Sequence, residues 1–268
     1  MDFQGTKVLI TGASGEIGSA IARHLAKEGA DIFLQFNTKQ TVIDNLASQL
    51  KRIQSQKKSF ERNSSVHSYQ SNLINPSNQD SPQETSNRQT SFDQTESRKL
   101  IETIIAEHGG LDILINCIGD FSIKPLTELS SEEFKHVLDS NLSIAFDLSQ
   151  AALKGMKRQK NGKILHFGYA NASSIEAKPN ILPYHIAKMG LILLTKSFAQ
   201  IGSPDNVFVN CISPGVVESS QYWPTTQTNL GRPIKINELI EATTFLLKSD
   251  YLNGVNLELD SGWRKEFS

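Results

Sequence analysis

The chain has 268 residues, of which 38% are hydrophobic and 21% charged, and its formal net charge is −1 at pH 7. It has no basic block, no apolar start and no apolar run near the roughly 18 residues of a membrane span, which argues against nucleic-acid and membrane partners and against a signal peptide. Cys117 and Cys211 stand alone in apolar runs, so we expect reduced core thiols in a cytoplasmic protein and no metal site.

A glycine-rich turn near the start has the layout of a nucleotide-binding loop. Residues 7–10 predict a buried strand, residues 11–18 the turn and residues 19–28 a helix, which together open a dinucleotide-binding βαβ unit. Glycines let the backbone approach a pyrophosphate, which then rests on free N–H groups at the start of the helix. The alternative is a plain glycine-rich connection. The cofactor contacts predicted in this turn are Gly12, Ser14, Gly15, Ile17 and Gly18.

The second predicted strand, residues 30–36, ends without the acidic residue that would bind the ribose 2′-hydroxyl of NAD. Asn37, Thr38 and Lys39 follow it, and their amide, hydroxyl and ammonium groups could hold a 2′-phosphate. We therefore favour NADP(H) over NAD(H) as the cofactor; the alternative is that Lys39 is a solvated turn residue. Residues 41–53 then predict a helix from the spacing of their apolar positions.

Residues 55–98 are rich in Ser, Asn, Gln and Thr. Within them, residues 66–73 predict a half-buried strand, whereas the apolar side chain of Phe92 stands alone in residues 75–96, which cannot add much to a core. We interpret residues 75–96 as a flexible or loosely packed surface insertion in an otherwise single domain that spans residues 1–268. A partner-binding segment is the alternative.

The middle of the chain predicts a helix over residues 97–107 and the central buried strand over residues 111–116. Ser130 and Glu133 have the spacing of a capping box, so we expect a helix to begin there. The apolar face of that helix carries one amide, Asn141. It would be a satisfied core amide, the site of a helix distortion, or a functional group.

Tyr184 and Lys188 are the candidate catalytic pair. On a helix their i, i+4 spacing places both side chains on one face. The ammonium can stabilise a phenolate and lower the pKa of Tyr184, which makes this residue a candidate general acid in carbonyl reduction. On spacing alone, a chance pair of neighbours is the alternative. The helix, residues 184–198, is apolar on several faces, which favours a subunit interface.

The remaining elements complete an alternating pattern. Residues 163–167 and 207–212 predict strands, residues 238–247 a helix, and residues 254–263 a last strand. Since strands and helices alternate throughout, we predict an α/β fold: a doubly wound, Rossmann-type parallel sheet of about seven strands with helices on both faces.

Taken together, the motifs between about residues 6 and 263 resemble the short-chain dehydrogenase/reductase family. They are the turn at residues 11–18, the segment Asn116-Cys117-Ile118-Gly119, Asn141, the pair Tyr184 and Lys188, and the turn Pro214-Gly215. Glu16 departs from the common one-domain pattern, because it stands where that pattern has its second glycine.

The resemblance implies hydride transfer between a nicotinamide and a carbonyl or alcohol carbon. Tyr184 would exchange the proton of the substrate oxygen, Lys188 would lower the pKa of Tyr184 and bind the nicotinamide ribose, and Asn141 would order a water in a proton relay. The resemblance also implies cofactor contacts outside the glycine turn. They are Asn72 and Leu73 at the adenine, Asn116 and Gly119 in the segment after the central strand, and Pro214, Gly215 and Val217 at the nicotinamide amide. The segment 220–230, with Tyr222 and Trp223, takes the place of the substrate lid.

Relatives of this form include 3-oxoacyl-ACP reductases and pteridine-type reductases. We therefore expect a small-molecule carbonyl or alcohol substrate, with 3-oxoacyl thioesters among the candidates, and a homo-oligomer, either tetramer or dimer. The alternative is a catalytically impaired nucleotide-binding or sensor protein.

The catalytic serine of the family has no direct counterpart. Counting back from Tyr184 by the spacing of the family leads to Asn171, whereas alignment on the preceding strand leads to Tyr169. Ser173 follows in the same loop. Any of the three could hydrogen-bond a substrate carbonyl, and we favour Tyr169.

Overall fold

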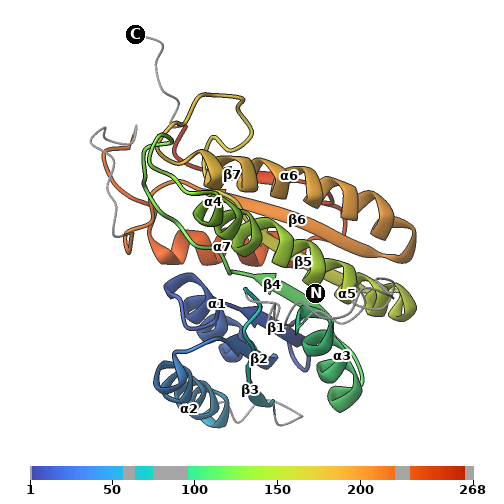
Figure 1. Ribbon diagram of the computed structural model, residues 1–268. Coiled ribbons are helices and arrows are strands. Elements are labelled where there is room, and N and C mark those ends of the chain that lie inside the picture. Colours follow the sequence, from blue (N-terminus) through green and yellow to red (C-terminus); the bar gives the residue numbers. More distant parts are fainter. Residues whose placement is uncertain (1, 57–63, 75–95, 221–229, 263–268) are drawn as a thin grey trace, which may run out of the picture.

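The protein folds around one parallel sheet of seven strands in the order β3-β2-β1-β4-β5-β6-β7. The structure is a computed structural model that describes residues 2–56, 64–74, 96–220 and 230–262 (Figure 1). The strands are β1 (Lys7–Thr11), β2 (Asp31–Phe36), β3 (Val66–Gln70), β4 (Ile113–Asn116), β5 (Gly162–Phe167), β6 (Val207–Pro214) and β7 (Asn256–Leu259). This confirms the predicted Rossmann-type sheet and the order of its strands along the chain.

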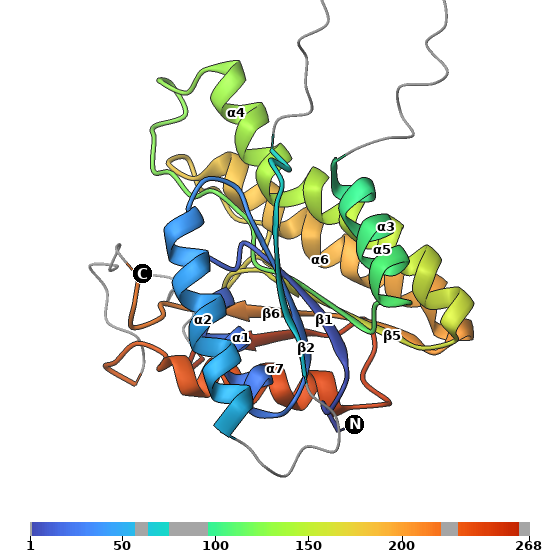
Figure 2. The same ribbon diagram turned by 90° about the horizontal axis from the view of Figure 1, so that it is seen from below.

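Helices cover both faces of the sheet (Figures 1 and 2). On one face lie α1 (Glu16–Lys27), α2 (Gln40–Gln56) and α7 (Ile236–Lys248); on the other lie α3 (Glu96–His108), α5 (Ile144–Gln159) and α6 (Leu182–Gly202). Each layer has its own hydrophobic core. The first includes Ile21, Leu46 and Leu246, and the second includes Ile101, Leu148 and Phe198.

The central strands are buried on both faces, which is why they appear in the sequence as continuous apolar runs. Every residue of β2, β4 and β5 is buried. In the edge strand β3, Val66 is buried and the next four residues are alternately half-buried and exposed, in keeping with the predicted half-buried strand. The strand order reverses between β1 and β4, and parallel α/β sheets bind ligands at such a switch point, outside the carboxyl ends of the strands.

The helix predicted after Ser130 is divided into three pieces. The capping box is confirmed: Ser130 Oγ accepts from the Glu133 N–H at 3.1 Å, and Glu133 Oε2 accepts from the Ser130 N–H at 2.8 Å. It starts α4 (Ser131–Leu138), which continues into the π-helical turn η1 (Asp139–Ser143) and then α5. Asn141 lies in η1 and donates from Nδ2 to the Val137 carbonyl at 3.0 Å. A side chain that takes an i−4 carbonyl competes with the backbone ladder, which accounts for the distortion here.

Several predictions fall outside the described residues. The proposed insertion at residues 75–96 does so except for Glu96, which begins α3. Tyr222, Trp223 and Trp263 also lie outside the described ranges. No helix in the described ranges is both long and apolar enough to cross a membrane.

Candidate active site

The glycine turn after β1 is packed too closely for side chains. Gly12 has φ +63°, and a Cβ there would lie 3.0 Å from the Cys117 carbonyl oxygen. A Cβ at Gly18 would lie 2.9 Å from the Gly12 oxygen, so the start of α1 packs directly on the turn. Backbone rather than side chain therefore faces the space above the sheet. This is the form of a loop that binds phosphate through N–H groups.

The same turn is fixed in place from β2. Gln35 Oε1 accepts from the Gly12 N–H at 3.0 Å, and the Gln35 carbonyl accepts from the Ala13 N–H at 3.1 Å. Ser14 and Ile17 are partly exposed, and Glu16 is exposed, so water can screen its carboxylate. The carboxylate of Glu16, the residue that departs from the family pattern, therefore lies in solvent at the start of α1.

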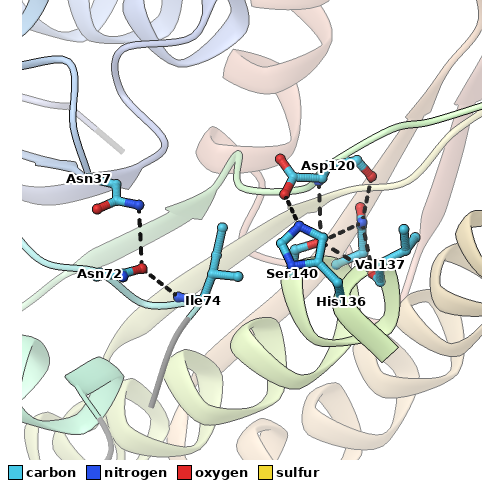
Figure 3. A network of polar contacts seen from close by, with 8 residues as sticks. Asn37, Asn72, Ile74, Asp120, His136, Val137 and Ser140 are labelled. Atoms are coloured by element: carbon cyan, nitrogen blue, oxygen red, sulfur yellow. Dashed lines mark hydrogen bonds and ion pairs between the residues drawn. The ribbon is translucent and has the colours of Figure 1, made fainter. Parts of the chain in front are cut away.

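Two amides meet beyond the ends of β2 and β3 (Figure 3). Asn37 Nδ2 donates to Asn72 Oδ1 at 3.3 Å, and the Ile74 N–H donates to the same oxygen at 3.3 Å. Leu73, beside Asn72, is 7% exposed and packs in the second core. Lys39 is exposed immediately before α2. The predicted adenosine contacts thus come together from two adjacent strands.

Asn116 joins the carboxyl ends of the two central strands. Thr11 Oγ1 donates to Asn116 Oδ1 at 2.8 Å, across the pair of residues that face each other in the β1–β4 register. Asn116 is 4% exposed. Its amide holds the two strands together at the switch point and directs the chain toward Gly119.

Asn141 and Lys188 meet at Gly119. A Cβ built on Gly119 would lie 2.2 Å from Asn141 Oδ1 and 3.4 Å from Lys188 Nζ. Asn141 Nδ2 donates to the Asp120 carbonyl at 2.8 Å and to the Val137 carbonyl, within a group that also contains Ser140 and His136 (Figure 3). Asn141 Oδ1 is buried and has no hydrogen-bond partner among the described residues. A buried acceptor that lacks a protein partner beside an ammonium is a suitable place for a bound water.

Lys188 is 5% exposed, and its Nζ donates to the Phe167 carbonyl at the end of β5 at 2.7 Å. Burial lowers the pKa of Lys188 to about 8, although the nearby thiols of Cys211 and Cys117 act in the opposite direction. The ammonium is 5.5 Å from the centroid of the Tyr184 ring. The predicted pair therefore shares one helix face, as the i, i+4 spacing requires.

The pKa of Tyr184 differs from expectation. Lys188 was expected to lower it, but in the protein alone the pKa of Tyr184 is raised, first by burial and then by the neighbouring Tyr169 phenol. That prediction is wrong for the chain without ligands, because burial disfavours the phenolate more than a lysine that donates to Phe167 can compensate. Tyr184 is consequently a protonated phenol at neutral pH.

The three candidates for the missing serine have different surroundings. Tyr169 lies against Tyr184, with ring centroids 5.3 Å apart, and its hydroxyl is hydrogen-bonded to His185 Nδ1 at 2.5 Å. Ser173 is exposed, and its Oγ donates to Glu258 Oε1 on β7 at 2.6 Å. Asn171 has φ +65° in the turn between them. The ring contact between Tyr169 and Tyr184 places Tyr169 directly beside the candidate acid.

Sequence reasoning missed two residues around Tyr184. Phe121 packs edge-on against the Tyr184 ring, with centroids 4.8 Å apart, and is 40% exposed. His185 follows Tyr184 in α6 and is 2% exposed. The position of His185 beside the candidate tyrosine was a signal, but the sequence does not show that the loop after β5 folds back to it.

The turn after β6 lies beside the same loop. The Ala170 N–H donates to the Pro214 carbonyl at 2.8 Å, and the Gly215 N–H donates to the Leu259 carbonyl at 2.9 Å. Val217 is 5% exposed and forms a bridge with Ile234. A cavity of about 500 Å³ opens beyond Gly215, but neither Tyr184 nor Lys188 lines it. The predicted contacts with the nicotinamide amide are therefore close in space to the Tyr169 loop.

The described residues contain no cluster able to hold a metal ion.

Comparison with known proteins is consistent with this arrangement. The family profile described as "short chain dehydrogenase" matches residues 6–75, and the one described as "Enoyl-(Acyl carrier protein) reductase" matches residues 91–264. The 3-oxoacyl-[acyl-carrier-protein] reductase FabG of Escherichia coli (strain K12) is 27% identical over 276 residues, covering 98% of this chain and 98% of that protein. Nodulation protein G of Rhizobium sp. (strain N33) is 30% identical over 219 residues, covering 82% and 76%.

Solved structures share the fold. An NAD+-bound xylitol dehydrogenase has a TM-score of 0.78 and 24% identity, covering 98% of this chain and 100% of that one. A short chain dehydrogenase from Burkholderia cenocepacia J2315 in complex with NADP has a TM-score of 0.79 and 21% identity, covering 98% and 99%. At these identities the likeness establishes the fold alone.

Proposed function

Since the chain belongs to the short-chain dehydrogenase/reductase family, we propose that it reduces a carbonyl compound through Tyr184, Lys188 and Asn141. The observation that carries this proposal is that Asn141 Oδ1 and Lys188 Nζ approach one point at Gly119. Lys188 also shares a face of α6 with Tyr184. An amide, an ammonium and a phenol so placed are the parts of a proton-transfer chain.

The described residues fit a dinucleotide. The side-chain-free turn at Gly12, Gly15 and Gly18 would hold the pyrophosphate, Asn72 and Leu73 the adenine, and the turn at Pro214 and Gly215 the nicotinamide amide. The remaining contacts that we propose are Ser14, Ile17, Asn116, Gly119 and Val217. When bound, the nicotinamide supplies the hydride. The protein supplies orientation and the proton.

The proton comes from Tyr184. Because the pKa of Tyr184 is raised, the phenol is protonated at neutral pH and can donate to the carbonyl oxygen as the carbon gains a hydride. The Lys188 ammonium then stabilises the phenolate that remains. Asn141 Oδ1 accepts from a water that returns a proton through Lys188 to Tyr184. Hydride and proton together convert the carbonyl to an alcohol.

NADP(H) is the cofactor that we propose over NAD(H). β2 ends at Phe36, and the next three residues, Asn37, Thr38 and Lys39, carry no carboxylate that would repel a 2′-phosphate. Lys39 is exposed at the same end of the sheet as Asn37, so its ammonium can reach a phosphate there.

A 3-oxoacyl thioester is the substrate class that we propose first. It is supported by the match to FabG along nearly the full length of both chains. The loop after β4 adds exposed apolar side chains: Phe121, which packs on Tyr184, is 40% exposed, and Ile123 and Leu126 are 53% and 48% exposed. The rings of Phe121 and Tyr169, which both pack on Tyr184, favour a second candidate, a flat pterin-like ring.

The proposal is tested by NADPH oxidation with acetoacetyl thioesters, simple ketones and quinonoid pterins, with Tyr184→Phe as the control. We expect turnover on at least one class and its loss in the variant. Turnover that survives Tyr184→Phe would contradict the mechanism. Tight NADPH binding without turnover on every class would instead support a nucleotide-binding sensor.

We also propose a homo-oligomer, a dimer or tetramer, working in the cytoplasm. Large apolar side chains are exposed on α5 and α6, where a second copy could cover them: Phe146 is 41% exposed, Ile186 39%, Leu193 67% and Ile201 52%. The free thiols Cys117 and Cys211 suit a reducing compartment. Light scattering of the purified protein tests the assembly, and a monomer would contradict it.

A further inference from the structure

Tyr169, which is half-buried, and His185, which is buried, form a polar contact directly beside Tyr184. Tyr169 follows β5, and His185 lies in the first turn of α6, yet the Tyr169 hydroxyl is 2.5 Å from His185 Nδ1. The Tyr169 ring is 5.3 Å from that of Tyr184. His185, which belongs to none of the motifs found in the sequence, is thus hydrogen-bonded to Tyr169, and the Tyr169 ring lies next to the proposed acid Tyr184.

The direction of this hydrogen bond follows from the other ring nitrogen. Burial lowers the pKa of His185, with the Lys178 ammonium acting in the same direction, while a hydrogen bond to the Ser174 backbone and the Glu176 carboxylate act in the opposite one. With a lowered pKa the imidazole is neutral at pH 7 and carries one proton. His185 Nε2 is buried and has no partner among the described residues. A buried N–H without an acceptor is rarer than an under-used lone pair. We take the proton to lie on Nδ1, from where His185 donates to the Tyr169 oxygen.

That direction leaves the proton of Tyr169 available. Burial and then the Glu176 carboxylate raise the pKa of Tyr169 to about 12, so it remains a phenol. The charged groups of the loop before α6, Lys178 and Glu176, pair with each other at 2.6 Å. Ser173, which could have served as a donor, is held by Glu258.

We infer that His185 is a positioning residue that holds the Tyr169 hydroxyl as a hydrogen-bond donor to the substrate carbonyl oxygen. This inference rests on the proposed carbonyl reduction. Two phenols then act on one oxygen: Tyr184 transfers its proton, and Tyr169 donates a hydrogen bond that strengthens as negative charge develops. Had His185 been the acceptor, the Tyr169 proton would be engaged and no donor would remain.

The first test needs neither cofactor nor substrate. The tautomer of His185 is measured by ¹⁵N NMR of the histidine-labelled protein, with His185→Asn identifying its signals. We expect the Nδ1–H form at pH 7, and a change in its Nδ1 shift in Tyr169→Phe. An Nε2–H tautomer would overturn the inference whatever the substrate proves to be.

The second test is a double-mutant cycle on the best substrate of the panel. Tyr169→Phe should lower kcat by about 10²-fold, as loss of one donor to a developing oxyanion does. His185→Leu should lower it by about tenfold, equivalent to one hydrogen bond. The two losses should not add, because His185 acts only through the Tyr169 hydroxyl.

His185→Asn serves as the conservative variant, because its amide N–H can replace Nδ1–H, and it should retain most of the activity. Additive losses, or an Asn variant as impaired as the Leu variant at equal melting temperature, would refute the positioning role. If Tyr184→Phe abolishes turnover while Tyr169→Phe leaves it unchanged, this inference fails alone. If Tyr184→Phe leaves turnover unchanged, the proposed function fails.

Discussion

The side-chain oxygen of Asn141 and the ammonium of Lys188 converge on Gly119. A Cβ at that glycine would be 2.2 Å from Asn141 Oδ1 and 3.4 Å from Lys188 Nζ. Asn141 reaches this place from η1 and Lys188 from α6, while Gly119 follows β4. The loop after β4, the π-helical turn η1 and helix α6 therefore meet at Gly119, where a side chain would collide with Asn141.

Gly119→Ala tests this crowding. The added methyl group must displace Asn141, so we expect kcat to fall by more than about tenfold and the free energy of unfolding to fall by about 1–3 kcal/mol, the cost of overpacking. Steady-state kinetics and urea unfolding measure the two effects. Gly155→Ala, on α5, is the matched control. Its methyl group would lie 2.7 Å from Ile105 Cδ1, the movable end of a side chain. Equal kcat values for the two variants would contradict the prediction.

Asn141→Ala removes the unpartnered oxygen itself. We expect kcat to fall at least about tenfold through loss of the proton relay, while the dissociation constant for NADPH changes little. Stopped-flow turnover and fluorescence titration measure the two quantities. Ser140→Ala is the control: it removes the hydrogen bonds that Ser140 Oγ accepts from the Asp120 N–H and from Asn141 Nδ2, but keeps the Asn141 side chain with its Oδ1. A similar loss of kcat in both variants would assign the effect to the helix distortion instead.

The fold could be predicted because its signals are local. β1, β2 and β4 are buried on both faces, so their apolar runs are unbroken in the sequence, and the glycines between β1 and α1 mark a turn with close backbone packing at Gly12 and Gly18. The edge strand β3 was recognisable from its alternation. These features depend on a few neighbouring residues and require no knowledge of long-range contacts.

The site was predicted only in part, because its contacts join distant segments. Asn141 stood out as an amide in an apolar face, but the periodicity does not reveal that its Nδ2 takes the Val137 carbonyl and produces η1. The contact between Tyr169 and His185 depends on how the loop after β5 returns to α6. The lowered pKa expected for Tyr184 was wrong because burial, which spacing cannot measure, dominates it.

Lys188 should make the stability of the ligand-free protein depend on pH. Its pKa is about 8 in the folded protein against 10.5 for the ordinary group, so between these values the unfolded chain binds more protons than the folded one. The contribution of Lys188 to stability therefore rises as pH increases from about 8 toward 10.5.

The measurement is urea unfolding at several pH values for the wild type and for Lys188→Met, which keeps an unbranched side chain without the charge. The difference between their unfolding free energies isolates Lys188 from the other titrating groups. We expect the wild type to gain on the variant as pH rises. A constant difference, or a loss relative to the variant, would show that the ammonium is not destabilised by burial.

Cofactor preference should depend on the residues after β2. Lys39→Ala removes the ammonium proposed to bind a 2′-phosphate, so we expect the dissociation constant for NADPH to rise by about tenfold with little change for NADH. Asn37→Asp should act further in the same direction, because its carboxylate repels the phosphate and can accept from a ribose 2′-hydroxyl. Fluorescence titration with both cofactors measures these constants.

Lys51→Ala is the control for a general loss of positive charge, because Lys51 is an exposed lysine toward the far end of α2. Equal weakening of NADPH binding by Lys39→Ala and Lys51→Ala would mean that no specific 2′-phosphate contact exists, and unchanged binding in both would favour NAD(H).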